Sequence, residues 1–260
     1  MNKRLSIAAG AALIVAVGAL AATLLFSGQS ATAAGETKLD KKEVEKIVYD
    51  YLMENPEVII EAVQRLQAKE VAQEEARVAA YVAENLDYIE GPKNSFVAGN
   101  PEGDVTIVEF TDYHCTYCKQ NLNTLMNFVE ADGNIRLVLR EFPALRGRAP
   151  SMEAAIAAMA SLEQGKYMEF HLAMMNSKGA LTPTRIEDIA LSVGIDIVEL
   201  NAKMKDKSVE AGIEANVEMA HNLGIDGTPG FVVGGQVLIG LRDKAELTRA
   251  VKEARSKAKS

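Results

Sequence analysis

Residues 109–121 read EFTDYHCTYCKQN and contain both cysteines of the 260-residue chain, Cys115 and Cys118. The stretch follows a β-branched, apolar run at residues 104–111 and opens a helical pattern over residues 115–130. The pair therefore lies at a strand-to-helix turn. The first N–H groups of a helix and their partial positive charge favour the thiolate of Cys115, so its pKa should fall below the ~8.5 of a free thiol. We expect Cys118, one turn into the helix, to face inward and to resolve a mixed disulfide formed at Cys115.

Three other roles for the pair are less well supported. A zinc site normally has four ligands, and the sequence has no second C-x-x-C motif; His114 adjoins Cys115, but His171 and His221 are scattered. A structural C-x-x-C disulfide would close a very small loop and add little stability. An accidental pair is disfavoured because every cysteine of the chain falls in this motif. The sequence therefore predicts a redox-active Cys115–Cys118 pair, with no metal and no cofactor.

The N-terminus has the parts of an export signal. Lys3 and Arg4 precede an uncharged apolar run at residues 5–26, and a small polar segment with an Ala-Thr-Ala cleavage pattern follows at residues 27–35. We predict that residues 1–33 are a signal peptide, or an uncleaved signal anchor because the apolar run is long enough to span a bilayer. In both cases the positive end stays inside and the rest of the chain is exported to the periplasm or cell envelope.

Charge and composition restrict the class of protein. Removing residues 1–33 removes two basic residues and no acidic ones, which changes the formal net charge from −8 to −10. An acidic surface without basic clusters argues against nucleic acid as a partner. Hydrophobic residues make up 48% of the chain, enough to form a core without disulfide cross-links. A stabilising role for the two cysteines is therefore a poor explanation.

Residues 38–90 are predicted to be helical and highly charged. Asp40 and Glu43 form a plausible capping box, and Asn55-Pro56-Glu57 predicts the start of a second helix. The apolar positions of this second helix recur at helical spacing: Val58, Ile59, Ala62, Val63, Leu66, Val71, Val78, Val82, Leu86 and Ile89. A narrow stripe among charged residues favours packing against another helix, so we predict that residues 38–90 form a homo-oligomer. The alternative is a helix folded back onto its own domain.

The rest of the chain, residues 93–260, has an α/β pattern. Strands are predicted at residues 104–111 and 135–142, then a helical insertion at about 150–223 with breaks near 179–184 and Gly194, and finally a hairpin of residues 230–233 and 237–239 around Gly234-Gly235, followed by a helix at about 243–258. The order is strand, helix, strand, helical insertion, hairpin and helix. The cysteine pair lies at the first strand-to-helix turn of this domain.

Three stretches of this domain resemble the DsbA family of exported proteins with the thioredoxin fold. They are GNPEGDVTIVEFTDYHCTYC, REFPALRGRAPSMEAAIAAMA and GIDGTPGFVVGGQVLIG, which resemble the family's first strand with its active-site turn, the segment leading into its helical insertion, and its cis-proline loop with the C-terminal hairpin. In addition, VEKIVYDYLMENPEVIIEAVQRLQ resembles the N-terminal helical segment of the ScsC-like and Com1-like branch. The resemblance implies a thioredoxin fold with a helical insertion, preceded by an extended α-helical segment.

The resemblance also assigns roles to single residues. Cys115 matches the attacking cysteine and Cys118 the resolving cysteine. Pro229 matches the cis-proline beside the pair, and the residue before it, Thr228, would pair with an extended substrate chain like an added strand. Glu109 matches an acid beneath the active site in part of the family, where a raised pKa suits proton transfer with Cys118. A partly exposed strand residue is the alternative for Glu109.

The residues between the cysteines indicate the subclass. DsbA-like oxidases commonly have Pro-His there, whereas this chain has Thr116-Tyr117, so the pair should be a weaker oxidant. Tyr117, together with Thr228, resembles the DsbC-type isomerases and the ScsC-like branch; Thr116 departs from the usual Gly or Pro. We count Thr116 and Tyr117 with the substrate-binding residues. His114 could assist the thiolate, but we expect an exposed histidine without a role.

These observations predict an exported thiol–disulfide oxidoreductase acting on unfolded or misfolded proteins, with a membrane redox partner and a leaning towards isomerase or reductase activity. The first alternative is a monomeric DsbA-like dithiol oxidase. The second is a copper-binding envelope protein, since ScsC-like proteins are associated with copper tolerance. The helical insertion contains methionines at positions 152, 159, 168, 174 and 175, among others. They form no dense cluster, so we expect core packing or a soft substrate-binding surface.

Overall fold

The computed structural model describes residues 40–145 and 150–258. The predicted signal peptide, with its apolar run, lies outside the described residues. Within those two ranges no helix is both long and apolar enough to cross a membrane. The chain divides into two compact units, which meet between Ile59 and Ile60, and each unit is described by itself.

The first unit contains helix α1 (Lys41–Glu54). The predicted capping box is confirmed: the Glu43 N–H donates to Asp40 Oδ1 at 3.0 Å, and the Asp40 N–H donates to Glu43 Oε2 at 3.2 Å. The helix ends at Asn55, whose N–H donates to the Tyr51 carbonyl at 2.9 Å. No residue of α1 is buried. Its apolar side chains are therefore available to a partner.

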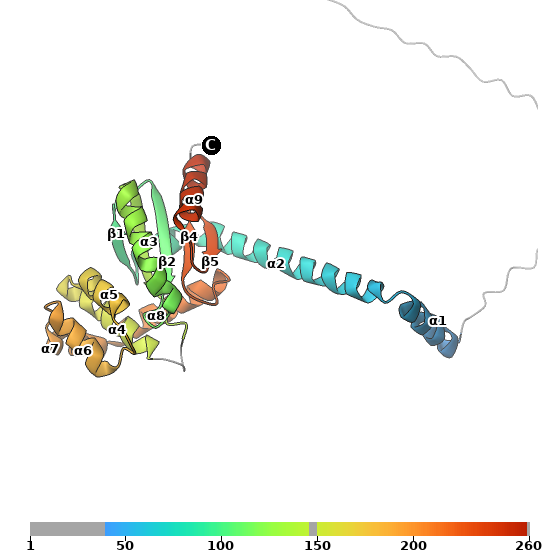
Figure 1. Ribbon diagram of the computed structural model, residues 1–260, viewed down its shortest axis with the longest axis horizontal. Helices are drawn as coiled ribbons and strands as arrows, with labels where there is room; N and C mark the ends of the chain where they lie inside the picture. Colours follow the sequence, from blue (N-terminus) through green and yellow to red (C-terminus); the bar gives the residue numbers. More distant parts are fainter. Residues whose placement is uncertain (1–39, 146–149, 259–260) are drawn as a thin grey trace, which may run out of the picture. The chain divides into compact units, whose positions relative to one another are not determined.

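The second unit is built on a single sheet. Its described strands are β1 (Phe96–Gly99), β2 (Val105–Thr111), β3 (Ile135–Glu141), β4 (Gly230–Val233) and β5 (Gln236–Ile239). They lie in the order β1-β3-β2-β4-β5; β2 and β3 are parallel and the other neighbours are antiparallel (Figure 1). The four predicted strands are confirmed, whereas β1 was not predicted. It is a four-residue edge strand that ends at Gly99, and this is too short to show a period of two.

Helices account for most of the remaining chain. They are α2 (Glu57–Glu90), α3 (Thr116–Asp132), α4 (Ser151–Ala160), the 3₁₀ turn η1 (Ser161–Gln164), α5 (Tyr167–Asn176), α6 (Pro183–Ser192), α7 (Ile197–Met204), α8 (Lys207–Asn222) and α9 (Lys244–Lys257). Figure 1 shows α4 to α7 gathered as one group beside the sheet. The predicted helical insertion is thus a small bundle. It has two breaks more than predicted: one at η1 and Gly165, where the chain adopts a positive φ of 65°, and one at Lys205 and Asp206, between α7 and α8.

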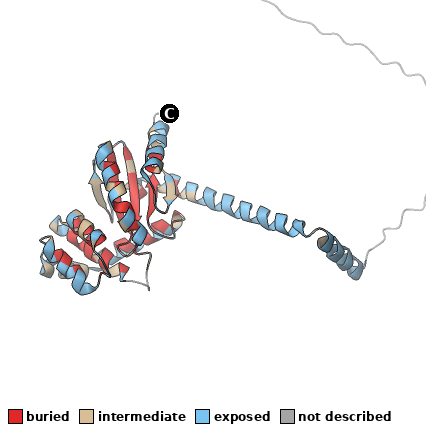
Figure 2. Ribbon diagram, in the orientation of Figure 1, coloured by how far each residue is buried: buried red, intermediate tan, exposed pale blue. Residues whose placement is uncertain are grey.

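Alternation along β2 and β3 divides the core between two faces of the sheet. Ile107 and Leu137 belong to a cluster that includes buried residues of α3, α9 and the helical bundle. Val108 and Val138 point the other way, into a cluster with α8 and the end of α2. Figure 2 shows that buried residues concentrate on the sheet and on the helices that cover it. Both faces of the central strands are therefore covered, as expected for parallel strands.

The two halves of α2 differ in their surroundings. Val82 and Ile89, near its C-terminal end, are buried against the second cluster. Arg140 of β3 donates to the carbonyls of Tyr88, Ile89 and Gly91 at 2.8–3.1 Å. These hydrogen bonds satisfy carbonyls at the end of the helix that have no partner within it. This end of α2 packs on its own domain, the alternative that the sequence left open. Self-association remains a prediction for the part before it.

Candidate functional site

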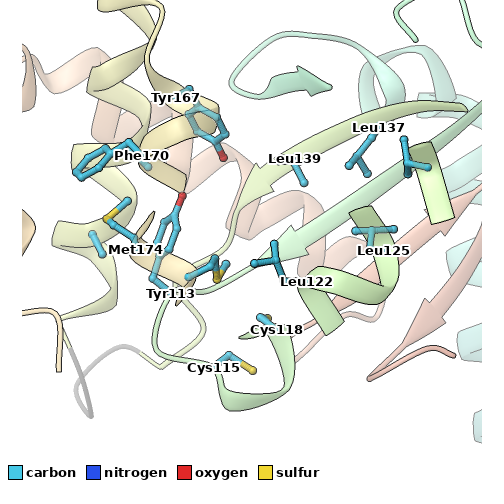
Figure 3. Packing of buried hydrophobic residues seen from close by; sticks show 14 of the residues in the cluster. Tyr113, Cys115, Cys118, Leu122, Leu125, Leu137, Leu139, Tyr167, Phe170 and Met174 are labelled. Atoms are coloured by element: carbon cyan, nitrogen blue, oxygen red, sulfur yellow. The ribbon is translucent and has the colours of Figure 1, made fainter. Parts of the chain in front are cut away.

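Cys115 and Cys118 lie at the start of α3. Cys115 is the N-cap residue, and Cys118 is in the first turn with 1% of its surface exposed. Figure 3 shows the two side chains at this end of the helix, below the apolar residues of the core. Between them, Thr116 is exposed and Tyr117 is 61% exposed. The strand-to-helix turn is therefore as predicted, with one sulfur near the surface and the other inside.

The surroundings of Cys115 favour its thiolate. A hydrogen bond from Cys118 is the largest influence, and the Thr228 hydroxyl and the N–H groups of Tyr117 and Cys118 act in the same direction. Burial opposes them, but the pKa of Cys115 still falls to about 6. In its protonated form, the thiol instead donates to the Thr228 carbonyl at 3.1 Å. At neutral pH the anion prevails, and it is the nucleophilic form.

Cys118 has the opposite tendency. Burial raises the pKa of its thiol well above the usual range, and the hydrogen bond to Cys115 and the charge of Glu109 add to this. Cys118 therefore keeps its proton while Cys115 is a thiolate. Before it can attack a mixed disulfide, this proton must move to a nearby base.

Glu109 is placed to be that base. It belongs to β2 and is 3% exposed, so the expected inward orientation is confirmed and the partly exposed alternative is not. Burial, followed by the charges of Glu141 and Cys115, raises the pKa of Glu109 to about 8. A carboxyl group that titrates near neutral pH can accept and return a proton during a reaction cycle.

Thr228 and Pro229 complete the site from a distant part of the sequence. Their peptide bond is cis, the form that the resemblance predicted. The Thr228 carbonyl lies beside the Cys115 sulfur. Pro229 directly precedes β4, which pairs with β2, so the sheet itself brings the two segments together. A substrate chain that reaches Cys115 would pass the Thr228 backbone.

A buried polar cluster next to the site was not predicted. Glu141, the last residue of β3, accepts hydrogen bonds from the hydroxyls of Tyr113 at 2.8 Å and Tyr167 at 2.6 Å. Tyr113 also contacts His171 Nδ1 at 2.9 Å. Figure 3 shows the Tyr113 and Tyr167 hydroxyls pointing towards the same region. One signal was available: alternation in β3 places Glu141 on the same face as Leu139, which is buried.

Two family models match this chain. Residues 92–253 match the model described as thioredoxin, and residues 40–73 match the model described as copper resistance protein ScsC N-terminal domain. The first match covers more than half of the sequence. The chain belongs to the thioredoxin family. The second match falls on α1 and the first half of α2, the segment that resembles the ScsC-like branch.

Three similar solved structures agree with this assignment. A thioredoxin-like oxidoreductase from Silicibacter pomeroyi is 42% identical, with 65% of this chain and 97% of that chain covered and a TM-score of 0.63. The thiol–disulfide exchange protein α-DsbA2 from Wolbachia pipientis is 30% identical, with 70% and 97% covered and a TM-score of 0.63. ScsC from Proteus mirabilis is 29% identical, with 85% and 98% covered and a TM-score of 0.61. They identify a DsbA- and ScsC-like thiol–disulfide oxidoreductase and confirm the predicted fold.

The curated relatives of this chain are much longer proteins. The Na(+)/H(+) antiporter NhaA 1 of Salinispora arenicola is 29% identical over 163 residues, which are 63% of this chain and 25% of the antiporter. The chain thus spans about a quarter of the length of the curated relatives it matches. The similarity concerns one part of those proteins.

His114 differs from the expectation of an exposed residue. Its side chain is only 10% exposed; Nε2 accepts a hydrogen bond from the Leu181 N–H at 3.3 Å, and Nδ1 lies 3.4 Å from Ser151 Oγ. Burial lowers the pKa of His114. The neighbouring Asp112 accepts hydrogen bonds from the His114 N–H at 2.8 Å and from Ser151 Oγ at 2.8 Å. His114 is thus a neutral part of the framework of the turn, and it adds no positive charge beside Cys115.

The methionines of the helical bundle lie mainly in the core. Met174 and Met175 are buried, and Met159 and Met168 pack against the same cluster. Core packing is therefore confirmed for these four. In the part of the chain that the structure describes, no group of three or more His, Cys, Asp or Glu side chains is arranged to hold a metal ion.

The Cys115 environment predicts a specific pH dependence of alkylation. In the wild-type protein, reaction with iodoacetamide should rise with pH to a midpoint near 6 and then level off, because only the thiolate reacts. Cys118→Ala removes the hydrogen bond that lowers the pKa most, so its midpoint should lie at higher pH. Cys118→Ser keeps a donor and should remain closer to wild type. Mass spectrometry after timed alkylation would measure the midpoints, and equal midpoints for Ala and Ser would contradict this account.

Proposed function

We propose that this protein is an exported thiol–disulfide oxidoreductase that acts on misfolded proteins of the periplasm or cell envelope, chiefly as an isomerase or reductase. The observation that carries the proposal is the asymmetry of the two thiols. Cys115 has a pKa of about 6 and is 7% exposed, whereas Cys118 is 1% exposed and has a raised pKa. The Cys115 thiolate can attack a substrate disulfide, whereas the Cys118 thiol stays protonated until a mixed disulfide forms.

The reaction begins when the Cys115 thiolate attacks one sulfur of a substrate disulfide. That S–S bond breaks, a Cys115–substrate disulfide forms, and the released substrate thiolate takes a proton from water. In isomerisation, another substrate thiolate attacks the mixed disulfide and regenerates the Cys115 thiolate, with no net redox change. In reduction, Cys118 gives its proton to Glu109 and attacks Cys115; two electrons pass to the substrate, which leaves as a dithiol, and Cys115–Cys118 becomes a disulfide.

The surroundings of the thiols support isomerase or reductase activity. Thr116-Tyr117 supplies no histidine between the cysteines, and His114 outside the motif is held neutral by burial. The Cys115 thiolate therefore lacks an adjacent imidazolium, so the dithiol form gains less stability than it would beside one. A membrane redox partner that supplies electrons would keep the pair reduced.

We also propose that the ScsC-like segment, residues 40–73, joins copies of the chain. Most of its larger apolar residues are exposed, among them Val63 at 48% and Leu66 at 56%. The buried end of α2 lies outside this segment. Exposed apolar residues at helical spacing are covered most simply by the same helix of other copies. An oligomer would bring several active sites to one misfolded substrate.

Reactivation of an enzyme with scrambled disulfides tests both proposals. Wild type should restore activity, and Val63→Glu with Leu66→Glu should give a monomer in light scattering with most of the reactivation lost. The matched control is Gln64→Glu with Gln67→Glu, which adds the same charge on the same helix and should behave like wild type. Substitution is preferable to removing residues up to 91, because that cut would also remove the buried end of α2. If wild type restores no activity, the isomerase proposal fails.

One observation favours a DsbA-like dithiol oxidase instead. A Cys115 pKa of about 6 stabilises the reduced form relative to an ordinary thiol, which makes the disulfide form more oxidising. An oxidase should oxidise a reduced peptide readily and restore no scrambled enzyme. Peptide oxidation and reactivation of the scrambled enzyme, measured together, distinguish an oxidase from an isomerase or reductase.

A further inference from the structure

Glu141 is a buried acid that the exchange mechanism above does not use. Its side chain is fully enclosed, and both tyrosine hydrogen bonds go to Oε1. Oε2 has no hydrogen-bond partner among the described residues. The Tyr113 hydroxyl uses its proton to donate to Glu141. In its contact with His171 we therefore assign the proton to Nδ1, which donates to the Tyr113 oxygen. The carboxyl group is thus half satisfied, which is costly for a buried charge.

Strand register places Glu141 close to Glu109. β2 and β3 are parallel, with Thr111 opposite Glu141 and Glu109 opposite Leu139. Glu109 and Glu141 therefore lie diagonally on adjacent strands, on the face covered by α3. With neighbouring strands ~4.8 Å apart and a rise of ~3.3 Å per residue, the two Cα atoms are about 8 Å apart, close enough for two buried carboxylates to repel each other.

We propose that Glu141 is a positioning residue for disulfide exchange: it forms a buried acid pair with Glu109 and fixes the protonation of Glu109 beneath Cys118. The inference rests on the proposed function, because it assigns Glu141 a part in the proton transfer of that reaction. Glu141 touches neither sulfur. It acts through Glu109, and its two tyrosines connect the pair to the active-site turn and to α5 of the helical bundle.

The charges around the pair support this role. The Glu141 charge is the largest influence after burial on the pKa of Glu109, which rises to about 8. Burial likewise raises the pKa of Glu141 to about 8, against the lowering effect of its two tyrosines, and the Asp112 charge adds to the rise. His171 is buried, with its pKa lowered to about 4, and therefore provides no positive charge at neutral pH. Two acids in this setting share protons, and neither ionises independently.

The groups that face Glu141 come from four elements. Glu109 lies on β2, Asp112 and Tyr113 follow it in the turn, Tyr167 and His171 lie on α5, and the cysteines of α3 lie beyond Glu109. Removing the Glu141 carboxyl should thus make Glu109 ionise at lower pH. Any proton transfer from Cys118 to Glu109 should then follow the same shift.

Carboxyl titration by ¹³C NMR of the reduced full-length protein, labelled at glutamate, tests the proposal directly. Glu109→Gln identifies the Glu109 signal. In Glu141→Gln, we expect the Glu109 midpoint to move to lower pH by about one pH unit. Tyr167→Phe keeps the ring that stacks on Phe96 and removes one hydrogen bond to Glu141. By favouring protonated Glu141, it should move the Glu109 midpoint in the same direction, and it provides a second measurement if Glu141→Gln does not fold.

A second readout follows the thiols. Reaction with 5,5′-dithiobis(2-nitrobenzoate) releases one molecule of 2-nitro-5-thiobenzoate when Cys115 attacks the reagent. A second is released when Cys118 resolves the mixed disulfide. The pH midpoint of the second release should shift with the Glu109 midpoint, whereas Glu130→Gln, an exposed change on α3, should leave it in place. An unchanged Glu109 midpoint in Glu141→Gln overturns the acid pair. A shifted Glu109 midpoint with no second release in any protein would leave the acid pair standing and overturn the exchange function.

Discussion

Replacing Cys118 with alanine is expected to turn this protein into a trap for its substrates. Cys115 would still attack a substrate disulfide, but no second thiol could resolve the mixed disulfide, so a Cys115–substrate adduct should accumulate. Turnover in insulin reduction should fall by on the order of a thousandfold or more, because both residues act as one unit. Non-reducing gels after incubation with an envelope extract would show adducts that disappear with dithiothreitol.

Cys115→Ala is the control for this trap. It removes the thiol with the lowered pKa and leaves Cys118, which is 1% exposed and has a raised pKa. This variant should capture no substrate and should also lack turnover. Equal capture by the two variants would contradict the assignment of Cys115 as the attacking residue. Capture by Cys115→Ala alone would reverse the two roles.

The local sequence was sufficient to predict the redox turn. A β-branched run followed by a helical pattern places Cys115 at a helix N-terminus, and the structure adds the N–H contacts that lower its pKa. The hairpin was equally readable, because Gly234 and Gly235 both adopt positive φ values, 53° and 79°. These features depend on residues close together in the chain. Thr228, far from Cys115 in sequence, was placed beside it only through the family resemblance.

The acid pair could not be predicted from local pattern alone. Glu109 and Glu141 stand on strands whose relative register depends on the whole sheet, and a one-residue slip would turn either side chain to the other face. His171 is one of the scattered histidines of the sequence, and only the fold brings it to Tyr113. Buried polar contacts between distant segments leave little trace in single-sequence periodicity.

The division of α2 was hidden for a related reason. Val63 and Leu66 are exposed, whereas Val82 and Ile89 are buried, yet both pairs belong to one run of apolar positions at helical spacing. Spacing shows that a helix has an apolar face, but it does not show what covers that face. The surface that covers the buried end of α2 includes Arg140, which donates hydrogen bonds to backbone carbonyls. Every residue has a backbone carbonyl, so the sequence gives no sign of these contacts.

Arg140→Leu is expected to lower the free energy of unfolding by about 3–5 kcal/mol, since each buried acceptor left unpaired costs about 1–3 kcal/mol. The guanidinium is fully buried and donates to the carbonyls of Tyr88, Ile89 and Gly91 as well as to Lys93 and Asn216. Burial lowers its pKa to about 10, so it remains charged at neutral pH. Leucine would leave several of these acceptors without a donor in the core. Urea unfolding followed by circular dichroism would measure the loss.

Arg249→Leu, an exposed change on α9, is the control and should alter stability by less than about 0.5 kcal/mol. A second readout separates stability from chemistry. Arg140 projects from the face of β3 opposite to Glu141, so the alkylation midpoint of Cys115 should stay near 6 in Arg140→Leu under native conditions. A loss of stability near 1 kcal/mol would mean that water replaces the guanidinium at the end of α2. A shifted alkylation midpoint of Cys115 would mean that the sheet transmits the change to the active site. The packing of α2 on the sheet would then influence the chemistry of Cys115.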